Sequence, residues 1–492
     1  MNNIIVFPMI LPVLTAILLV FFRKHIILQR WISVLVMTAN IVVSIVILLR
    51  VQAEGILRLD FGGWEPPFGI LFVADSFSML LVVTTNIVTV ACLIYAIFSV
   101  GKEYEYMFFY SFVLFLVGGV NASFLTGDLF NLFVSFEVML LSSYALIAFG
   151  GKKIQLKKSI PYIAINVVSS WIFLVAIAYL YGTLGTLNLA HLSQLIAENG
   201  QTPLVTVISI LFLIVFGLKS GLLLYQWLPA SYSAPPTAIA ALFGALLTKV
   251  GIYAMFRMFT LLFYHEPQIT HTLIGVMAAL TLIGGSIGAI ASNDLRYIVS
   301  YNVVIAVGFI FVGLAIGTQV AFEGSIYYII HDMIVKALLF LIAGTMITLS
   351  GSPKMNRMSG LIRNYPILGW LFFVVMLALA GIPPLSGFIG KVLLGQAAIE
   401  TGAYVLLALS FISALFVLYS LLRVFMDCFW GETMLSEEEE PPLRKGILFP
   451  LIMLGVLTFA LGLAPESIAS FVIDASDTLM NPSIYIDAIF QK

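Results

Sequence analysis

Five ionisable side chains lie deep inside apolar stretches of this sequence, where an unpaired charge is costly. They are Glu137, Lys219, Lys249, Lys336 and Lys391. Burial favours the neutral amine of a lysine, whereas a nearby carboxylate favours the protonated form. A lysine close to that balance gains or loses a proton with a small rearrangement. These residue types therefore predict a proton relay, in which Glu137 stabilises a protonated lysine such as Lys219.

Two further ionisable residues precede Lys336 in the same apolar stretch. Asp332 lies four residues before it, so the two can form a purely structural ion pair on one helix face or take part in the relay. His331 is either a core histidine with satisfied hydrogen bonds or a member of the relay. Ser220 and Asn302 are candidate supporting residues for these charges.

The composition indicates an integral membrane protein. Of 492 residues, 61% are hydrophobic and only 10% are charged, and the mean hydropathy is +1.11. A soluble protein carries about 25% charged residues, so a surface this apolar would not stay in water. Soluble enzymes, secreted scaffolds and nucleic-acid binders are thereby excluded, and a net charge of -1 offers no basic face for a phosphate backbone.

Apolar runs between charged or Gly/Pro-rich breaks predict an all-α membrane protein with about fourteen spanning helices. The expected spans are 3–22, 31–49, 74–98, 107–126, 129–149, 159–181, 204–227, 235–263, 271–292, 297–317, 322–350, 366–398, 403–430 and 447–465. Two shorter stretches, 189–199 and 465–479, mix apolar and polar residues at helical spacing. We expect both to lie at the membrane interface.

Lysine and arginine residues gather in the odd-numbered loops between these spans. They are Arg23, Lys24, Arg30, Lys152, Lys153, Lys157, Lys158, Lys354, Arg357, Arg363, Arg444 and Lys445. The positive-inside rule then predicts cytoplasmic odd loops and two extracytoplasmic termini. The run Glu437–Glu440 falls in a cytoplasmic loop and is interpreted as a solvated turn. Because Met1, Asn2 and Asn3 lack the basic region of a signal peptide, the first apolar run is expected to stay as a helix.

An internal repeat is visible in two ways. The fifth span opens with Gly-Asp-Leu at 127–129, and the tenth opens with Asn-Asp-Leu at 293–295. The fourth helix of each unit is interrupted, at 217–221 and 381–387, which is typical of an ion site in inverted repeats. Lys391 follows the second break, so it could instead complement a broken helix end.

The repeat predicts a division of the chain into four parts. The N-terminal helices occupy 1–105, the first five-helix repeat 106–264, the second repeat 270–430, and a loop, a last span and a tail 431–492. Five is an odd number, so the second repeat is expected to be inverted relative to the first.

Cofactor chemistry is not expected in this chain. Cys92 and Cys428 are two isolated cysteines in apolar runs, too few for a metal or iron–sulfur site. No haem ligand pair, nucleotide loop or HExxH motif stands out. We therefore predict no cofactor, no metal, no redox chemistry and no ATP hydrolysis. Together with the buried charges this favours a proton-conducting transporter over an enzyme.

Four segments between about 106 and 430 carry a resemblance to a known family. They are GDLFNLFVSFEVMLLSSYALIAFG, KSGLLLYQWLPASYSAPPTAIAALFGALLTKVGIY, KALLFLIAG and LALAGIPPLSGFIGK. They resemble the proton-translocating, antiporter-like subunits of respiratory complex I and of Mrp multisubunit sodium/proton antiporters. The resemblance implies fourteen spans and inverted five-helix repeats with interrupted helices 7 and 12.

The resemblance also implies roles for the buried charges. Glu137 and Lys219 would form a central ion pair, Lys249 would pass protons along the membrane plane, and Lys336 and Lys391 would be the charged residues of helices 11 and 12.

One position departs from the family pattern. Many complex I relatives carry a histidine four residues before the lysine of helix 11, where this chain has Asp332. His331 is displaced by one residue, or about 100° around a helix.

Within the family, the chain is more similar to the Mrp branch. Its 492 residues lack the C-terminal extension and lateral helix of the larger A subunit, and Lys391 stands where one complex I relative has a glutamate. The resemblance implies a bacterial plasma-membrane subunit that works with other Mrp subunits and exchanges cytoplasmic Na+ for external H+. Two alternatives stay open: a proton-pumping subunit of a respiratory NADH:quinone oxidoreductase, and a non-transporting assembly scaffold.

Overall fold

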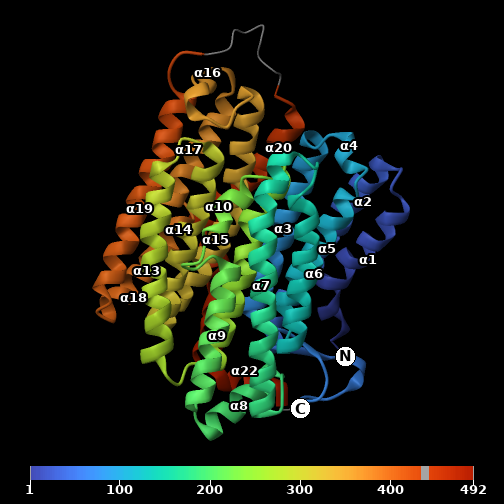
Figure 1. Ribbon diagram of the computed structural model, residues 1–492, viewed down its shortest axis with the longest axis vertical. Helices are drawn as coiled ribbons and strands as arrows, with labels where there is room; N and C mark the ends of the chain where they lie inside the picture. Colours follow the sequence, from blue (N-terminus) through green and yellow to red (C-terminus); the bar gives the residue numbers. More distant parts are fainter. Residues whose placement is uncertain (1, 434–442, 491–492) are drawn as a thin grey trace.

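A computed structural model describes residues 2–433 and 443–490 as one bundle of long helices that run roughly along its longest axis (Figure 1). Both chain ends lie at the same end of the bundle, which we call the terminal end. The opposite end carries the short helices α4 (Lys102–Glu105) and α16 (Leu361–Asn364). The run Glu437–Glu440 lies outside the described residues.

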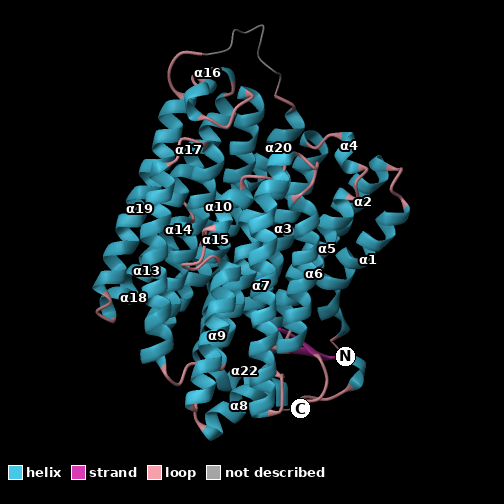
Figure 2. Cartoon of the chain, in the orientation of Figure 1, coloured by secondary structure: helices cyan, strands magenta, loops and turns pink. Residues whose placement is uncertain are grey.

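Three spanning helices and a hairpin form the N-terminal part. The helices are α1 (Phe7–Phe21), α2 (Ile26–Glu54) and α3 (Ser76–Ser99). The strands β1 (Leu57–Asp60) and β2 (Leu71–Ala74) pair antiparallel before α3, at the terminal end (Figure 2). Hydropathy does not predict this hairpin, because each strand has only four residues.

The next five spans form a first set. They are α5 (Phe109–Leu125), α6 (Leu129–Ile147), α7 (Lys153–Leu184), α9 (Pro203–Ser220) continued by α10 (Trp227–Tyr232), and α11 (Thr237–Leu242) continued by α12 (Thr248–Leu261). A π-helical segment, Phe243–Leu247, joins α11 to α12. The predicted interfacial stretch 189–199 is the short helix α8 (Leu189–Asn199) at the terminal end.

The following five spans form a second set. They are α13 (Pro267–Ala291), α14 (Leu295–Ile316), α15 (Gln319–Ser350), α17 (Pro366–Ala380) continued by α18 (Gly387–Glu400), and α19 (Tyr404–Val424). Helix α15 has 32 residues and is buried along most of its length. It packs against α11 of the first set, α14 and α18 of its own set, and α3. This central helix therefore joins the three parts of the bundle.

Three helices complete the described chain. They are α20 (Lys445–Leu463), α21 (Glu466–Met480) and α22 (Pro482–Phe490). The stretch 465–479 forms the helix α21, which packs against α3 and α15 and buries Val472 and Ala475. Hydropathy does not predict α22, which packs against α8 and β1.

The two sets share the same local contacts at opposite ends of the bundle. Asp128 caps α6 and forms an isolated bridge with Asn188. Asp294 caps α14 and forms an isolated bridge with Lys354. The first bridge lies at the terminal end near α8, and the second lies at the other end near α16 (Figure 1). This is the relation expected of one unit and its inverted copy.

Both sets also contain the same helix break. Helix α9 ends at Gly221 (φ +79) and α17 at Gly381 (φ +84), left-handed conformations that glycine adopts without strain. In each case two successive backbone N–H groups donate to one carbonyl, that of Gly217 or of Leu377. The two interruptions, predicted at 217–221 and 381–387, therefore have the same backbone conformation and hydrogen bonds.

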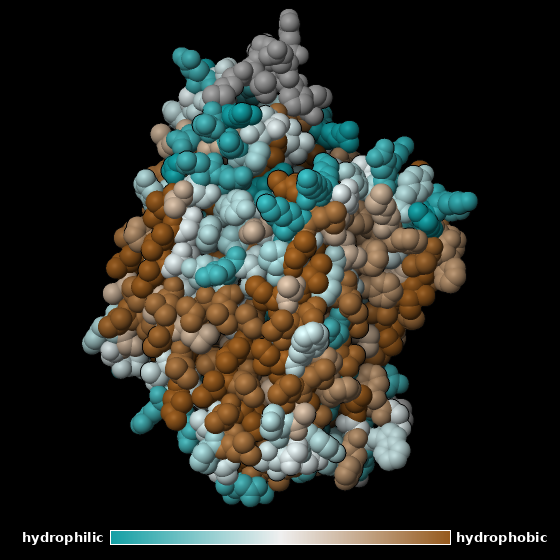
Figure 3. Space-filling view, in the orientation of Figure 1, coloured by the Kyte–Doolittle hydropathy of each residue, from teal (hydrophilic) through white to brown (hydrophobic). Residues whose placement is uncertain are grey.

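The surface and the helix lengths agree with a membrane protein. In the described part of the chain, twelve helices are long and apolar enough to span a membrane, and α5 and α17 are shorter apolar helices. An apolar band crosses the middle of the molecule, with polar residues at both ends (Figure 3). The predicted all-helical membrane fold is confirmed, apart from the small hairpin.

Candidate functional site

A serine hydroxyl lies between the first two charges of the predicted relay. Ser170 of α7 donates to Glu137 Oε1 of α6 at 2.5 Å, and Lys219 Nζ of α9 donates to Ser170 Oγ at 3.2 Å. Lys219 is buried, with 4% of its surface exposed, and its ammonium lies 4.9 Å from the centre of the Phe136 ring. Glu137 and Lys219 are thus joined through Ser170.

The helix break positions Lys219. It is the second-last residue of α9, two residues before the left-handed Gly221. Helix α12 packs closely on this break, since a Cβ on Gly251 would lie 2.7 Å from the backbone nitrogen of Ser220. Lys249, two residues earlier on α12, is therefore on the helix that contacts the end of α9.

The central feature is a carboxylate between two lysines. Asp332 Oδ2 lies 2.6 Å from Lys249 Nζ, and Asp332 Oδ1 lies 3.5 Å from Lys336 Nζ. All three side chains are at most 1% exposed. Lys249 also donates to the carbonyl of Gly244 at 3.0 Å, in the π-helical segment. Lys249 belongs to the first set of helices and Lys336 to the second, so Asp332 connects the two sets.

His331 faces away from this cluster, as its place one residue before Asp332 requires. Its Nδ1 lies 2.7 Å from Ser386 Oγ, in the break between α17 and α18. Its ring centre lies 5.2 Å from that of Tyr328. Among the described residues its Nε2 has no hydrogen-bond partner. His331 therefore lies between the Asp332 cluster and the second break.

Lys391 binds the broken end of α17. Its Nζ donates to the carbonyls of Leu379 and Ala380 at 2.7 and 2.9 Å. Lysine near a helix C-terminus satisfies free carbonyls and complements the helix dipole. The ammonium also lies 5.7 Å from the Phe309 ring and 5.9 Å from the Tyr328 ring. Tyr328 thus contacts both His331 and Lys391.

The structure does not bring the two predicted supporting residues into this arrangement. Ser220 Oγ donates to Gly217 O of its own helix at 3.4 Å. Asn302 Nδ2 donates to Ile298 O at 2.9 Å and lies 3.5 Å from Ser420 Oγ. In the described part of the chain, neither side chain forms a hydrogen bond with a buried charge. Ser170, and not Ser220, forms the hydrogen bond with the Lys219 ammonium. Ser220 follows Lys219 by one residue, so its side chain points about 100° away around the helix.

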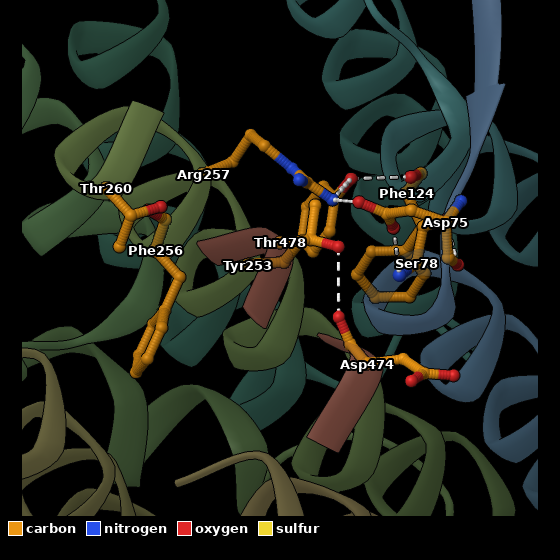
Figure 4. Close-up of polar contacts among 9 residues, drawn as sticks. All are labelled: Asp75, Ser78, Phe124, Tyr253, Phe256, Arg257, Thr260, Asp474 and Thr478. Carbon is orange, nitrogen blue, oxygen red and sulfur yellow. Dashed lines mark hydrogen bonds and ion pairs between the residues drawn. The ribbon is translucent and has the colours of Figure 1, made fainter. Parts of the chain in front are cut away.

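Sequence reasoning missed a second buried ion pair. Arg257 Nη2 of α12 lies 2.5 Å from Asp75 Oδ2 at the start of α3 and donates to Tyr253 Oη at 3.2 Å (Figure 4). Tyr485 of α22 lies over the guanidinium at 5.1 Å. The signal was present: Lys249, Tyr253 and Arg257 recur every four residues and share one face of α12.

The arrangement can hold and redistribute protons, since each buried lysine has an oxygen partner that a small side-chain movement can exchange. The polar contacts form three groups: Glu137 with Ser170 and Lys219, Lys249 with Asp332 and Lys336, and His331 and Lys391 at the second helix break. Within residues 2–433 and 443–490, no group of three His, Cys, Asp or Glu side chains could hold a metal ion.

The chain matches known proteins over its whole length. Residues 126–417 match the transmembrane family of NADH:quinone oxidoreductases and Mrp antiporters. The chain is 47% identical to the Na(+)/H(+) antiporter D subunit of Bacillus subtilis (strain 168) and 45% identical to that of Alkalihalophilus pseudofirmus. Both alignments cover 100% of this chain and 100% of the relative.

Solved structures give the same result. A chain of the Mrp complex from Dietzia sp. DQ12-45-1b superimposes with a TM-score of 0.92 at 28% identity, covering 99% of this chain and 100% of that chain. A chain of an archaeal respiratory membrane complex, the membrane-bound sulfane sulfur reductase, gives 0.90 at 25% identity, covering 98% and 99%.

This chain belongs to the NADH:quinone oxidoreductase/Mrp antiporter family of multi-pass membrane subunits. Within that family it is a D-type subunit of an Mrp Na+/H+ antiporter, and hence part of a multisubunit bacterial transporter.

Proposed function

We propose that this subunit carries the protons of the antiporter along the polar side chains from Glu137 to Lys391. External protons would be exchanged for cytoplasmic Na+, driven by the proton-motive force. Ser170 would join Glu137 to Lys219, and Asp332 would join Lys249 to Lys336.

The observation that carries the proposal is Asp332 between Lys249 and Lys336. Each buried charge costs about 2.5–3.5 kcal/mol in an apolar span, and one carboxylate cannot fully pair two ammonium groups. One of the two lysines is then favoured to release its proton whenever Asp332 moves toward the other. A carboxylate shared by the two sets of helices can thereby pass a proton from one set to the other.

Sodium is assigned to partner subunits. Among the described residues no group of three His, Cys, Asp or Glu side chains could hold a metal ion, and the buried acids Asp332 and Asp75 already pair with cations. We expect the partners to be subunits of the A, B, C, E, F and G types, embedded with this chain in the plasma-membrane lipid.

The proposal includes a membrane orientation and a repeat division. The lysine- and arginine-rich loops lie at the end opposite the termini, so that end is assigned to the cytoplasm and both termini to the outside. The matched caps at Asp128 and Asp294 and the matched breaks at Gly221 and Gly381 support inverted repeats at 106–264 and 270–430.

Sodium-driven proton movement in everted vesicles tests the proposal, with the whole complex expressed. Glu137→Ala and Lys219→Ala should abolish exchange while the complex still assembles. Lys157→Ala removes an exposed lysine and is the matched control, which should exchange normally. Full exchange in Glu137→Ala and Lys219→Ala would support the scaffold alternative. Proton pumping that requires NADH oxidation and no sodium would support the respiratory alternative.

A further inference from the structure

An open groove lies where α13 and α19 end, at the end of the bundle opposite the termini (Figure 1). Residues of 291–294, 354–359 and 423–427 line it, and we call it the α13–α19 groove. Its volume is about 850 Å³, within the range of roughly 300–1,000 Å³ that is typical of small-molecule sites. Helices α13 and α19 pack against each other. The groove therefore lies at the same end of two neighbouring spanning helices.

The charged residues that line the groove in the described part of the chain are two cations and two acids. They are Lys354, Arg423, Asp294 and Asp427. The Asp427 side chain is 48% exposed and lies 3.6 Å from Arg423 Nε, so it can accept a further cationic partner. Asp294 Oδ1 accepts a hydrogen bond from the backbone N–H of Arg296 at 2.9 Å. A ligand with separate positive and negative groups matches this lining, whereas a simple anion would meet both acids.

Arg423 is fixed on the end of α13. Its Nη1 donates to the carbonyl of Ile290 at 3.1 Å, and its Nη2 donates to Asn293 Oδ1. A cation at a helix C-terminus also complements the helix dipole. These acceptors are neutral, so they leave the guanidinium its positive charge. Lys354, on the segment after α15, is exposed and lines the same groove. A lysine and an arginine together can bind one phosphate group.

Apolar and aromatic side chains continue from the groove along both helices. Ile287 stands four residues before Ala291 on α13, and Tyr419 stands four residues before Arg423 on α19. Residues four apart share a helix face, and both side chains are exposed. Trp430, just after the groove, is also exposed. Tryptophan and tyrosine are typical of the membrane–water interface. The groove therefore lies at the level of lipid head groups, next to a surface suited to acyl chains.

We propose that the α13–α19 groove binds a zwitterionic phospholipid of the phosphatidylethanolamine class. The phosphate lies at Lys354 and Arg423, the ammonium lies at Asp427, and the acyl chains follow the exposed faces of α13 and α19. An anionic phospholipid such as phosphatidylglycerol offers the phosphate but no cation for Asp427. The site is independent of the proton relay. The proposed orientation of the chain assigns this lipid to the cytoplasmic leaflet.

Photoaffinity labelling of the assembled complex tests the site. The probe is a phosphatidylethanolamine with a diazirine in one acyl chain, and a phosphatidylglycerol with the same chains is the comparison. Mass spectrometry locates the labelled peptides. The phosphatidylethanolamine probe should label 283–291 and 415–426 about fivefold more strongly, because it gains one ion pair at the membrane surface. Equal labelling by the two probes, or no labelling of these segments, would overturn the proposal.

Two variants test the two charges separately. Lys354→Gln should lower labelling by both probes about fivefold, because the phosphate loses one cation. Asp427→Asn should lower labelling by the phosphatidylethanolamine probe alone, to the level of the other probe. Lys153→Gln and Glu103→Gln change exposed charges elsewhere at the same end of the bundle and are the matched controls. Labelling that Lys354→Gln and Asp427→Asn leave unchanged would overturn the head-group site.

Soluble glycerophosphoethanolamine distinguishes a lipid from a free phosphate compound. At the concentration of the probe it should not reduce the labelling, because it has no acyl chains to bury against α13 and α19. Loss of labelling under these conditions would overturn the assignment to a lipid. Because no transport is measured, each of these results is independent of whether the relay is correct.

Discussion

Lys249 Nζ lies 2.6 Å from Asp332 Oδ2, although the two residues belong to different sets of five helices. Lys336 Nζ lies 3.5 Å from the other oxygen of the same carboxylate. The two lysines therefore compete for one buried partner across the boundary between the sets.

Asp332→Asn should abolish exchange and destabilise the complex. Removing one partner of a buried ion pair costs about 3–5 kcal/mol, because the remaining charge is uncompensated. The double variant Asp332→Asn with Lys249→Gln should have a higher melting temperature than Asp332→Asn alone. It should still show no Na+/H+ exchange. Thermal unfolding and vesicle exchange measure the two effects separately. Recovery of exchange in the double variant would show that the pair is only structural.

Ser170→Ala should slow exchange by about tenfold, because it removes the hydroxyl that contacts both Glu137 Oε1 and Lys219 Nζ. Ser170→Thr keeps the hydroxyl and should retain most of the rate. The neighbouring Ser169 donates to Val215 O at 3.3 Å, so Ser169→Ala is the matched control and should behave as wild type. Equal rates in both alanine variants would contradict the role of Ser170.

Lys391→Met should lower both stability and exchange. It leaves the carbonyls of Leu379 and Ala380 without their half-buried donor, at about 1–3 kcal/mol. Lys391→Arg keeps a donor for these carbonyls and should restore the melting temperature. An arginine does not release its proton, so exchange should remain low. If Lys391→Arg catalyses Na+/H+ exchange at the wild-type rate, the only role of Lys391 is to donate hydrogen bonds to the carbonyls at the end of α17.

Arg257→Met should destabilise the complex by about 3–5 kcal/mol, since it leaves the Asp75 carboxylate buried without its cation. Arg257→Met with Asp75→Asn should restore the melting temperature. Exchange per assembled complex should match wild type in the double variant, because Arg257 lies about 12 Å along α12 from Lys249. A large loss of exchange in the stable double variant would instead place this pair on the proton path.

The membrane class, the spans and the buried charges could be predicted from the sequence because each depends on local properties. A run of about 20 apolar residues spans a bilayer whatever surrounds it. Gly221 and Gly381 mark the two breaks because a left-handed residue ends a helix locally. Lys219, Lys249 and Lys336 were identifiable because few charges occur in such runs.

The partners of those charges were decided by the tertiary structure alone. Helix periodicity allowed a pair of Asp332 with Lys336, but the shorter contact goes to Lys249, 83 residues away in the chain and on a helix of the other set. Ser170 carries no signal in its own segment, because serines such as Ser170 and the adjacent Ser169 are common in a spanning helix. Helix rotation and packing direct each side chain, and neither is encoded within a single apolar run.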